Sequence, residues 1–407
     1  KKGDKIAVFG RVQREYYKSG TGSGGKVNTK YVTNIFDSLK QSSDVVINEE
    51  VSETYAKWCE KNPFDIGDGW NQPWSQTEMP LTEELCKNAA AVSDKAIVII
   101  GRTAGESKDN SADKGSYNLS DGEYDMLKKV SDAFDKVCVV LNVGNIIDMK
   151  WAEELDISAV LYVWHGGQEG GAATADLLLG KAFPSGKLSD TIVYNIEDYP
   201  SFEGFSNDDE NVYIEDIFVG YRYFETFAKD KVMYPFGFGM GYTEFEVKTL
   251  SAEWKNNTVF VKAEVKNTGK FAGKETVQIY CGGEGEKLCR PSRELKAFKK
   301  TRELKPGETE TLAFEIDINE FAAYDDTGVT GNKSCYLLEK GTYKIYAGTD
   351  VRSAAEVFAF DLPETVVVKK CEALFALDRD MERMVNSGGK PEFETLKAAT
   401  QKREKPA

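Results

Sequence analysis

The sequence has few of the residues that several kinds of active site require. It contains one histidine, His165, and its seven cysteines form no C-x-x-C pair and no zinc-like spacing. A serine hydrolase triad lacks its nucleophile, because no G-x-S-x-G elbow occurs. One histidine and dispersed carboxylates give no ligand cluster, so we expect neither a metal site nor a cofactor.

Long apolar runs and an excess of positive charge are also missing. No segment is long and apolar enough to cross a bilayer, so we expect no membrane partner. The net charge is −15 and the basic residues form no stripe, which argues against nucleic acid as a partner. No leader opens the sequence, and the odd cysteine count is typical of free thiols. We therefore expect a cytoplasmic protein, with secretion as the alternative.

The pattern of the chain predicts four parts. Residues 1–195 alternate near-continuous apolar runs with helical stretches, which predicts an α/β domain around a mostly parallel sheet. Gly, Pro and aromatic residues dominate 196–243, which we interpret as a linker packed on the domains. Period-two alternation over 244–368 predicts an all-β sandwich. Residues 369–407 are polar and weakly helical, and we interpret them as a tail or tether.

Within the first part, the apolar runs predict five strands and the periodic stretches predict helices between them. One helix is expected to open at Ser120, where Glu123 completes a capping box. The expected strands are 5–9, 44–48, 95–100, 136–142 and 159–163, and two further helices are expected over 31–40 and 82–92.

A glycine-rich stretch over 19–25, SGTGSGG, is the first candidate site. Gly20, Gly22 and Gly25 satisfy G-x-G-x-x-G, and two acidic residues, Glu49 and Glu50, lie downstream as in a dinucleotide site. In that fold, however, the first glycine ends the first strand, whereas here the strand ends about ten residues earlier. The stretch therefore predicts a loop that makes a close backbone approach to a ligand, or a simple surface loop.

Two further candidates lie at the carboxyl ends of expected strands, where ligands of open α/β sheets gather. Glu106 follows the third strand in IGRTAGES, although an acidic residue on a polar loop is most often merely solvated. His165 ends the fifth strand, and we interpret it as a packed side chain rather than a catalytic one.

Several ordered stretches together resemble glycoside hydrolase family 3, in particular its β-glucosidases. The similarity covers about residues 5–362. The stretches are VVLNVGNIIDMKW (139–151), GQEGG (167–171), PSGKL (184–188), IFVGYRYF (217–224), YPFGFGMGYT (234–243), NTG (267–269) and RPSRELKAF (290–298).

The resemblance implies a six-stranded α/β sandwich followed by a fibronectin type III-like sandwich. It implies a retaining, exo-acting β-glucosidase that removes terminal β-D-glucosyl residues, as in polysaccharide degradation. The family's acid/base glutamate lies in a Gly-Glu pair that matches Gly105-Glu106, although the usual following glycine is Ser107 here. The family's GxGSG element matches residues 20–24, which makes Ser23 a predicted sugar contact.

Retaining hydrolysis needs a second carboxylate, and the family places that nucleophile in an SDW-like motif on a (β/α) barrel. This sequence contains no Ser-Asp-Trp. We therefore expect a barrel on a separate or cleaved segment to be a partner, and we favour a permuted order in which the barrel follows. The alternative is a non-catalytic carbohydrate-binding or scaffold module, and a nucleotide-binding protein is the third reading.

Overall fold

The structure is a computed structural model that describes residues 2–25, 27–68, 71–205, 209–283, 285, 287–374 and 377–398. The chain forms two compact units, one of residues 1–182 with 194–196 and one of 183–193 with 197–407. Within the described residues, no helix is both long and apolar enough to span a bilayer.

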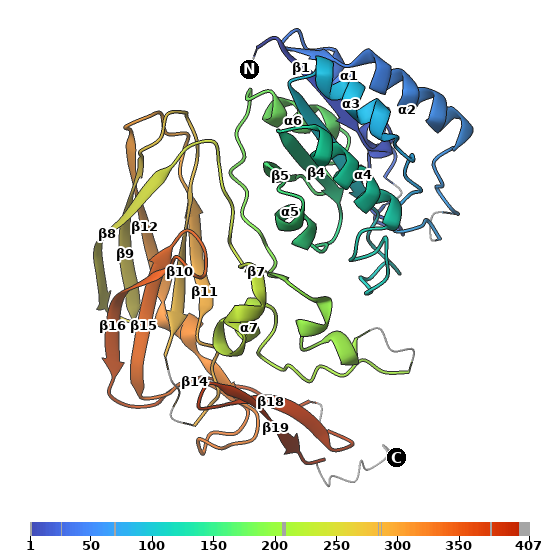
Figure 1. The fold of residues 1–407 in the computed structure, drawn as a ribbon. Helices are drawn as coiled ribbons and strands as arrows, with labels where there is room; N and C mark the ends of the chain where they lie inside the picture. The colour runs from blue at the N-terminus through green and yellow to red at the C-terminus, as the bar shows by residue number, and fades with distance from the viewer. Residues whose placement is uncertain are drawn as a thin grey trace. The chain divides into compact units, whose positions relative to one another are not determined.

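The first unit is built on a five-stranded parallel sheet in the order β2-β1-β3-β4-β5. Figure 1 labels β1, β4 and β5 of this sheet. The resemblance implied six strands, and the sheet has one fewer. The strands are β1 (Asp4–Phe9), β2 (Val45–Ile47), β3 (Lys95–Arg102), β4 (Val137–Val143) and β5 (Ala159–Tyr162). All five agree with the ranges expected from the sequence. The central strands β1, β3 and β4 are largely buried, and strands covered on both faces are apolar along most of their length.

Helices cover both faces of this sheet. Helices α1 and α6 share a hydrophobic cluster with one face, while α2, α3 and α4 pack on the other, where the rings of Phe9 and Phe134 meet. The helices are α1 (Ile35–Lys40), α2 (Glu49–Lys61), α3 (Glu83–Val92), α4 (Asp121–Ala133), α5 (Lys150–Glu154) and α6 (Gly170–Leu178).

Local capping residues fix where these helices begin. The capping box of α4 is present, with Ser120 and Glu123 bonding each other's backbone N–H, as predicted. Helix α1 begins four residues later than expected, because the Asn34 side chain caps it. Glu49 and Glu50 lie in the first turn of α2, a helix that we did not expect.

The second unit begins with residues that the sequence placed in the first domain and the linker. Strand β6 (Ile192–Val193) is only two residues long and pairs with β7 (Val232–Tyr234) rather than with the parallel sheet. The expected linker also holds helix α7 (Tyr221–Phe227), and Phe224 of this helix forms a small core with Val193 and Val232.

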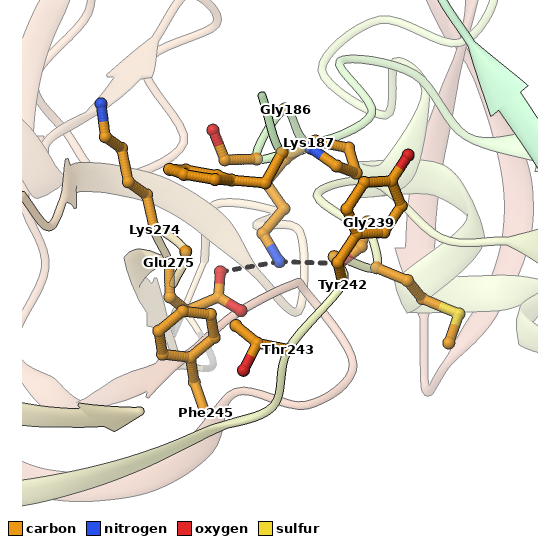
Figure 2. A pocket seen from close by; sticks show the side chains of 14 residues that line it. Gly186, Lys187, Gly239, Tyr242, Thr243, Phe245, Lys274 and Glu275 are labelled. Atoms are coloured by element: carbon orange, nitrogen blue, oxygen red, sulfur yellow. Dashed lines mark hydrogen bonds and ion pairs between the residues drawn. The ribbon is translucent and has the colours of Figure 1, made fainter. Parts of the chain in front are cut away.

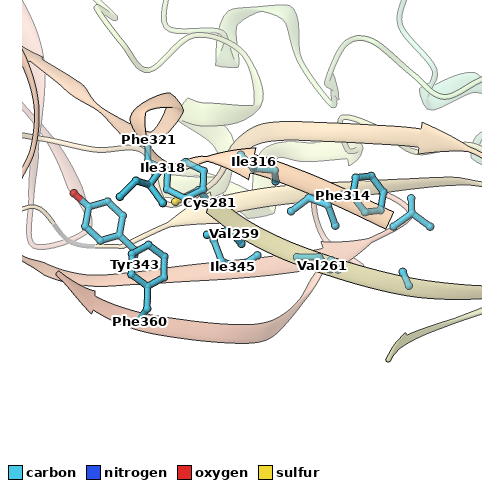
Figure 3. Close-up of a cluster of buried hydrophobic side chains, with 14 of the residues drawn as sticks. Val259, Val261, Cys281, Phe314, Ile316, Ile318, Phe321, Tyr343, Ile345 and Phe360 are labelled. Atoms are coloured by element: carbon cyan, nitrogen blue, oxygen red, sulfur yellow. The ribbon is translucent and has the colours of Figure 1, made fainter. Parts of the chain in front are cut away.

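Two antiparallel sheets of the second unit enclose one core, which confirms the predicted all-β sandwich. Figure 3 shows its side chains, with Val259 and Phe314 from one sheet facing Ile345 and Phe360 from the other. The sheets have the orders β12-β9-β8 and β11-β10-β15-β16. Their strands are β8 (Phe245–Lys255), β9 (Thr258–Asn267), β10 (Thr276–Gly282), β11 (Glu294–Lys300), β12 (Thr309–Asp317), β15 (Gly341–Gly348) and β16 (Ala355–Leu362). A third sheet joins β13 (Ala323–Asp325), β14 (Cys335–Leu338) and β17 (Val366–Lys370).

The prediction of weak helix after residue 368 is wrong for its described part. Strands β18 (Met381–Ser387) and β19 (Lys390–Leu396) form a hairpin with Gly388 and Gly389 at its turn. Both glycines have positive φ, 58° and 85°, as the tight hairpin turns with the correct twist require. Residues 399–407 of the expected tether lie outside the described residues.

Candidate active site

The glycine-rich loop and the loop after β3 lie against each other in the first unit. Thr21 pairs with Gly105 in an isolated parallel bridge, and the Thr21 N–H donates to the Ala104 carbonyl at 2.6 Å. The Thr21 hydroxyl is 3.1 Å from the carbonyl oxygen of Glu106. The backbone of the glycine loop therefore supports the loop that carries Glu106.

The glycines are required because the two loops approach so closely. A Cβ on Gly20 would lie 2.1 Å from the Ala104 carbonyl oxygen. Gly22 has φ +84°, and a Cβ there would lie 2.6 Å from both Cβ and Oε2 of Glu106. We expected a close backbone approach to a ligand, and the structure shows a close approach within the chain itself. The next α-helix begins only at Ile35, so the glycines do not lead into a helix as a dinucleotide site requires.

The two predicted site residues, Glu106 and Ser23, are brought together. Glu106 is exposed, and its Oε2 lies 3.4 Å from both the backbone nitrogen and the hydroxyl of Ser23. These are long hydrogen bonds in an exposed place, so they orient the carboxylate weakly and leave it accessible to a ligand. A carboxylate beside a hydroxyl at the carboxyl end of a buried strand can hold a sugar hydroxyl and exchange a proton.

The turn around Glu106 contains two residues of unusual backbone conformation. Gly105 has φ +111° and Ser107 has φ 59°. A non-glycine residue in the left-handed region costs roughly 1–2 kcal/mol. Ser107 therefore stores strain next to Glu106, at the position where the resemblance expects glycine.

His165 packs at the end of β5, as predicted. Its Nε2 lies 2.8 Å from the carbonyl oxygen of Arg102, and its ring stacks on Tyr17 with centroids 6.1 Å apart. Burial lowers the pKa of His165, which favours the neutral ring. The neutral ring must carry its proton on Nε2 to donate to that carbonyl, so the histidine braces the end of β3.

Sequence reasoning missed two groups that flank the Glu106 loop. Arg102 and Glu123 form a buried ion pair, and their side chains are 2% and 4% exposed. The capping box identified Glu123, but no sequence pattern identified Arg102. The Trp74 carbonyl accepts a hydrogen bond from the Thr103 N–H at 2.9 Å. The Lys108 ammonium lies 4.9 Å from the centre of the Trp74 ring. Trp74 comes from the irregular segment before α3, where no periodicity identifies it.

In the second unit, the stretches 184–188 and 234–243 meet in a structural contact rather than in a ligand site. Figure 2 shows the Lys187 ammonium between the Glu275 carboxylate, at 2.9 Å, and the Gly239 carbonyl, at 3.0 Å. The cavity there measures about 20 Å³, which has room for a water molecule and not for a sugar. Over the described residues of both units, no three His, Cys, Asp or Glu side chains are grouped to hold a metal ion.

Family models match parts of both units. Residues 1–242 match the C-terminal domain of glycosyl hydrolase family 3, and residues 275–351 match a fibronectin type III-like domain. The chain is 51% identical over 383 residues to a β-glucosidase of Ruminococcus albus, covering 93% of this chain and 40% of that protein. It is 32% identical to an exo-α-(1→6)-L-arabinopyranosidase of Bifidobacterium breve, covering 86% of this chain and 43% of that protein.

Solved structures show the same fold. A β-glucosidase from Paenibacillus barengoltzii superposes with a TM-score of 0.93 at 44% identity, covering 98% of this chain and 45% of that one. β-Glucosidase 3B from Thermotoga neapolitana, in complex with glucose, gives 0.81 at 34% identity, covering 90% and 51%. The chain belongs to glycoside hydrolase family 3. It spans about half or less of the length of these relatives.

Proposed function

We propose that this chain is part of a retaining β-glucosidase that removes terminal β-D-glucosyl residues, and that Glu106 is the acid/base carboxylate. The observation that carries the proposal is the contact between Glu106 and Ser23. Two loops that the family resemblance links to proton transfer and to the glycone are far apart in sequence, and their side chains meet at 3.4 Å. The β-glucosidase relatives support the substrate class.

The chemistry assigned to Glu106 has two steps. In the first, a carboxylate nucleophile attacks the anomeric carbon, the glycosidic C–O bond breaks, and the Glu106 carboxyl gives its proton to the leaving oxygen. In the second, the Glu106 carboxylate takes a proton from water, and the water oxygen attacks the anomeric carbon. That attack releases the sugar and restores the nucleophile. Ser23 is proposed to share its hydroxyl between Glu106 and the glycone.

We propose that a barrel segment outside these 407 residues supplies the nucleophile. The absence of Ser-Asp-Trp from the sequence and the share of the relatives left uncovered support this. The two carboxyl groups must then lie roughly 5 to 5.5 Å apart in the assembled enzyme. We favour the order in which the barrel follows this chain.

The test is Glu106→Ala in the full-length protein that contains both segments. Loss of a general acid lowers kcat/KM by roughly a hundred- to ten-thousand-fold on alkyl β-glucosides, whose leaving groups need a proton. The leaving group of dinitrophenyl β-glucoside needs no proton, so kcat/KM for this substrate is expected to change little. Its kcat is expected to fall because water is no longer activated, and azide should restore kcat by attacking in place of water.

Asp109→Ala is the matched control, because Asp109 is an exposed carboxylate on the same loop. It is expected to leave both substrates unaffected. Equal rates for Glu106→Ala and the parent protein on alkyl glucosides would refute the acid/base role. A full-length protein that binds glucosides without hydrolysing either substrate would instead be the non-catalytic module.

A further inference from the structure

Arg102 is the last residue of β3, and its side chain is almost completely buried, with 2% of it exposed. The N–H donors of its planar guanidinium reach both backbone carbonyls and a carboxylate. Its Nε donates to the Ser116 carbonyl at 3.0 Å, and Nη1 donates to the Gly101 carbonyl at 2.9 Å. Nη2 reaches the Asn118 carbonyl at 3.4 Å. One side chain therefore binds the end of β3 to the far end of the loop that contains Glu106.

Glu123 holds the same guanidinium from the first turn of α4. Both of its carboxylate oxygens accept from Arg102, with Nη2 and Oε2 2.7 Å apart. Oε2 also accepts the backbone N–H of Ser120 at 2.8 Å and the Ser120 hydroxyl at 3.0 Å. The ion pair is thus continuous with the helix cap, and it ties strand, loop and helix into one hydrogen-bonded unit.

Stability alone is a weak reason for such a pair. Desolvating two charges costs several kcal/mol each, and apolar side chains of similar volume often stabilise a fold as well or better. What apolar side chains cannot do is fix three carbonyls and a helix cap in one geometry. This points to a requirement for precise loop placement.

Resting on the function proposed above, we propose that Arg102, held by Glu123, is a positioning residue for Glu106. Glu106 follows Arg102 by four positions, and the backbone of Arg102 is fixed independently by the 2.8 Å contact of its carbonyl with His165. Displacing a reacting group by about 1 Å can cost about a hundred-fold in rate. A looser loop therefore weakens proton transfer before it unfolds the domain.

Arg102→Lys is the test variant, because it keeps the charge that Glu123 requires and removes the fork. A lysine ammonium has three donors at one point and cannot reach the Glu123 carboxylate and the loop carbonyls together. Arg352→Lys is the matched control. Arg352 lies in the second unit, and its Nε is 2.9 Å from Oε1 of Glu225, a side chain that is 4% exposed.

The experiment measures kcat/KM of the full-length protein on an alkyl and on a dinitrophenyl β-glucoside. Titration with a 2-deoxy-2-fluoroglucoside counts the active sites, so that loss of folded enzyme is corrected for. Arg102→Lys is expected to lose about ten- to a hundred-fold on the alkyl glucoside and less than about three-fold on the dinitrophenyl glucoside. Arg352→Lys is expected to keep the parent ratio between the two substrates.

Equal losses on both substrates, or no loss, would overturn the proposal, because a purely structural role does not distinguish leaving groups. If Arg102→Lys does not fold, Glu123→Gln replaces it, because glutamine keeps the shape of the glutamate side chain and the helix cap. The same ratio of kcat/KM on the two substrates is then measured. Glu106→Ala is measured in the same series. If Glu106→Ala loses more kcat/KM on the alkyl than on the dinitrophenyl glucoside, and neither Arg102→Lys nor Glu123→Gln does, only the positioning role fails. If Glu106→Ala affects both substrates equally, the proposed function fails.

Discussion

Adding one methyl group at Gly22 perturbs Glu106 without removing any of its atoms. The Cβ of Gly22→Ala would lie 2.6 Å from both Cβ and Oε2 of Glu106, whereas nonbonded carbon atoms rest about 3.5–4.0 Å apart. The carboxylate side chain must therefore shift by about 1 Å, or the glycine loop must retreat by the same amount. An alanine at φ +84° also costs roughly 1–2 kcal/mol of backbone energy.

We expect Gly22→Ala in the full-length protein to lower stability by about 1–2 kcal/mol and, on the role proposed for Glu106, to lower kcat/KM on alkyl β-glucosides by up to about a hundred-fold. Gly24→Ala is the control from the same loop, because a Cβ there meets nothing within 4 Å and its φ is not positive. Urea denaturation measures stability, and initial rates on alkyl and dinitrophenyl glucosides measure the acid step. If Gly22→Ala matched Gly24→Ala in both assays, the close packing of the two loops would be refuted.

Two further predictions concern stability. Ser107→Gly removes the strain at φ 59° and should raise the free energy of unfolding by up to about 1 kcal/mol, measured by urea denaturation; a decrease would contradict the strain. Burial raises the pKa of Glu78 to about 7, above its unfolded value, so the folded state binds the proton more tightly. The parent protein should therefore lose stability relative to Glu78→Gln as pH rises from about 4.5 to 7. The same difference in free energy of unfolding between the two proteins at pH 5 and at pH 8, measured by urea denaturation, would disprove this.

Much of the fold follows from local sequence. The central parallel strands could be predicted because both of their faces are buried, which makes runs such as Ala96–Ile100 apolar throughout. The start of α4 could be predicted because Ser120 and Glu123 are three positions apart and satisfy each other's backbone N–H. Sandwich strands such as β9 and β12 alternate, because only one face of their sheet meets the core.

The errors also have local causes. Helix α2 buries only Val51, Ser52 and Tyr55, so its polar sequence hides its periodicity, although Asn48 caps it. The β18–β19 hairpin was missed because β19 is almost entirely exposed and carries no apolar alternation. Its Gly388-Gly389 turn was the available signal for a hairpin.

The site was predictable only in part, because its geometry depends on pairs that are distant in sequence. Glu106 and Ser23 could be named from a resemblance, yet nothing local predicted that they would touch across 83 positions. The Arg102–Glu123 pair spans 21 positions, and its arginine carries no motif by which it could be recognised. Tertiary contacts of this kind have no periodicity, so a single sequence does not reveal them.

On the function proposed above, the same contacts bear on how catalysis is divided between this chain and the barrel segment. The backbone of the loop that carries Glu106 is held within one unit by Thr21, by Arg102 and by the His165 contact with the Arg102 carbonyl. A proton donor must be placed to within about half an ångström, and rigid neighbours achieve this more accurately than a flexible partner does. On the function proposed above, this unit therefore fixes the loop of Glu106 before the barrel segment docks. On the same proposal, docking sets the distance between the Glu106 carboxylate and the nucleophile of the barrel segment.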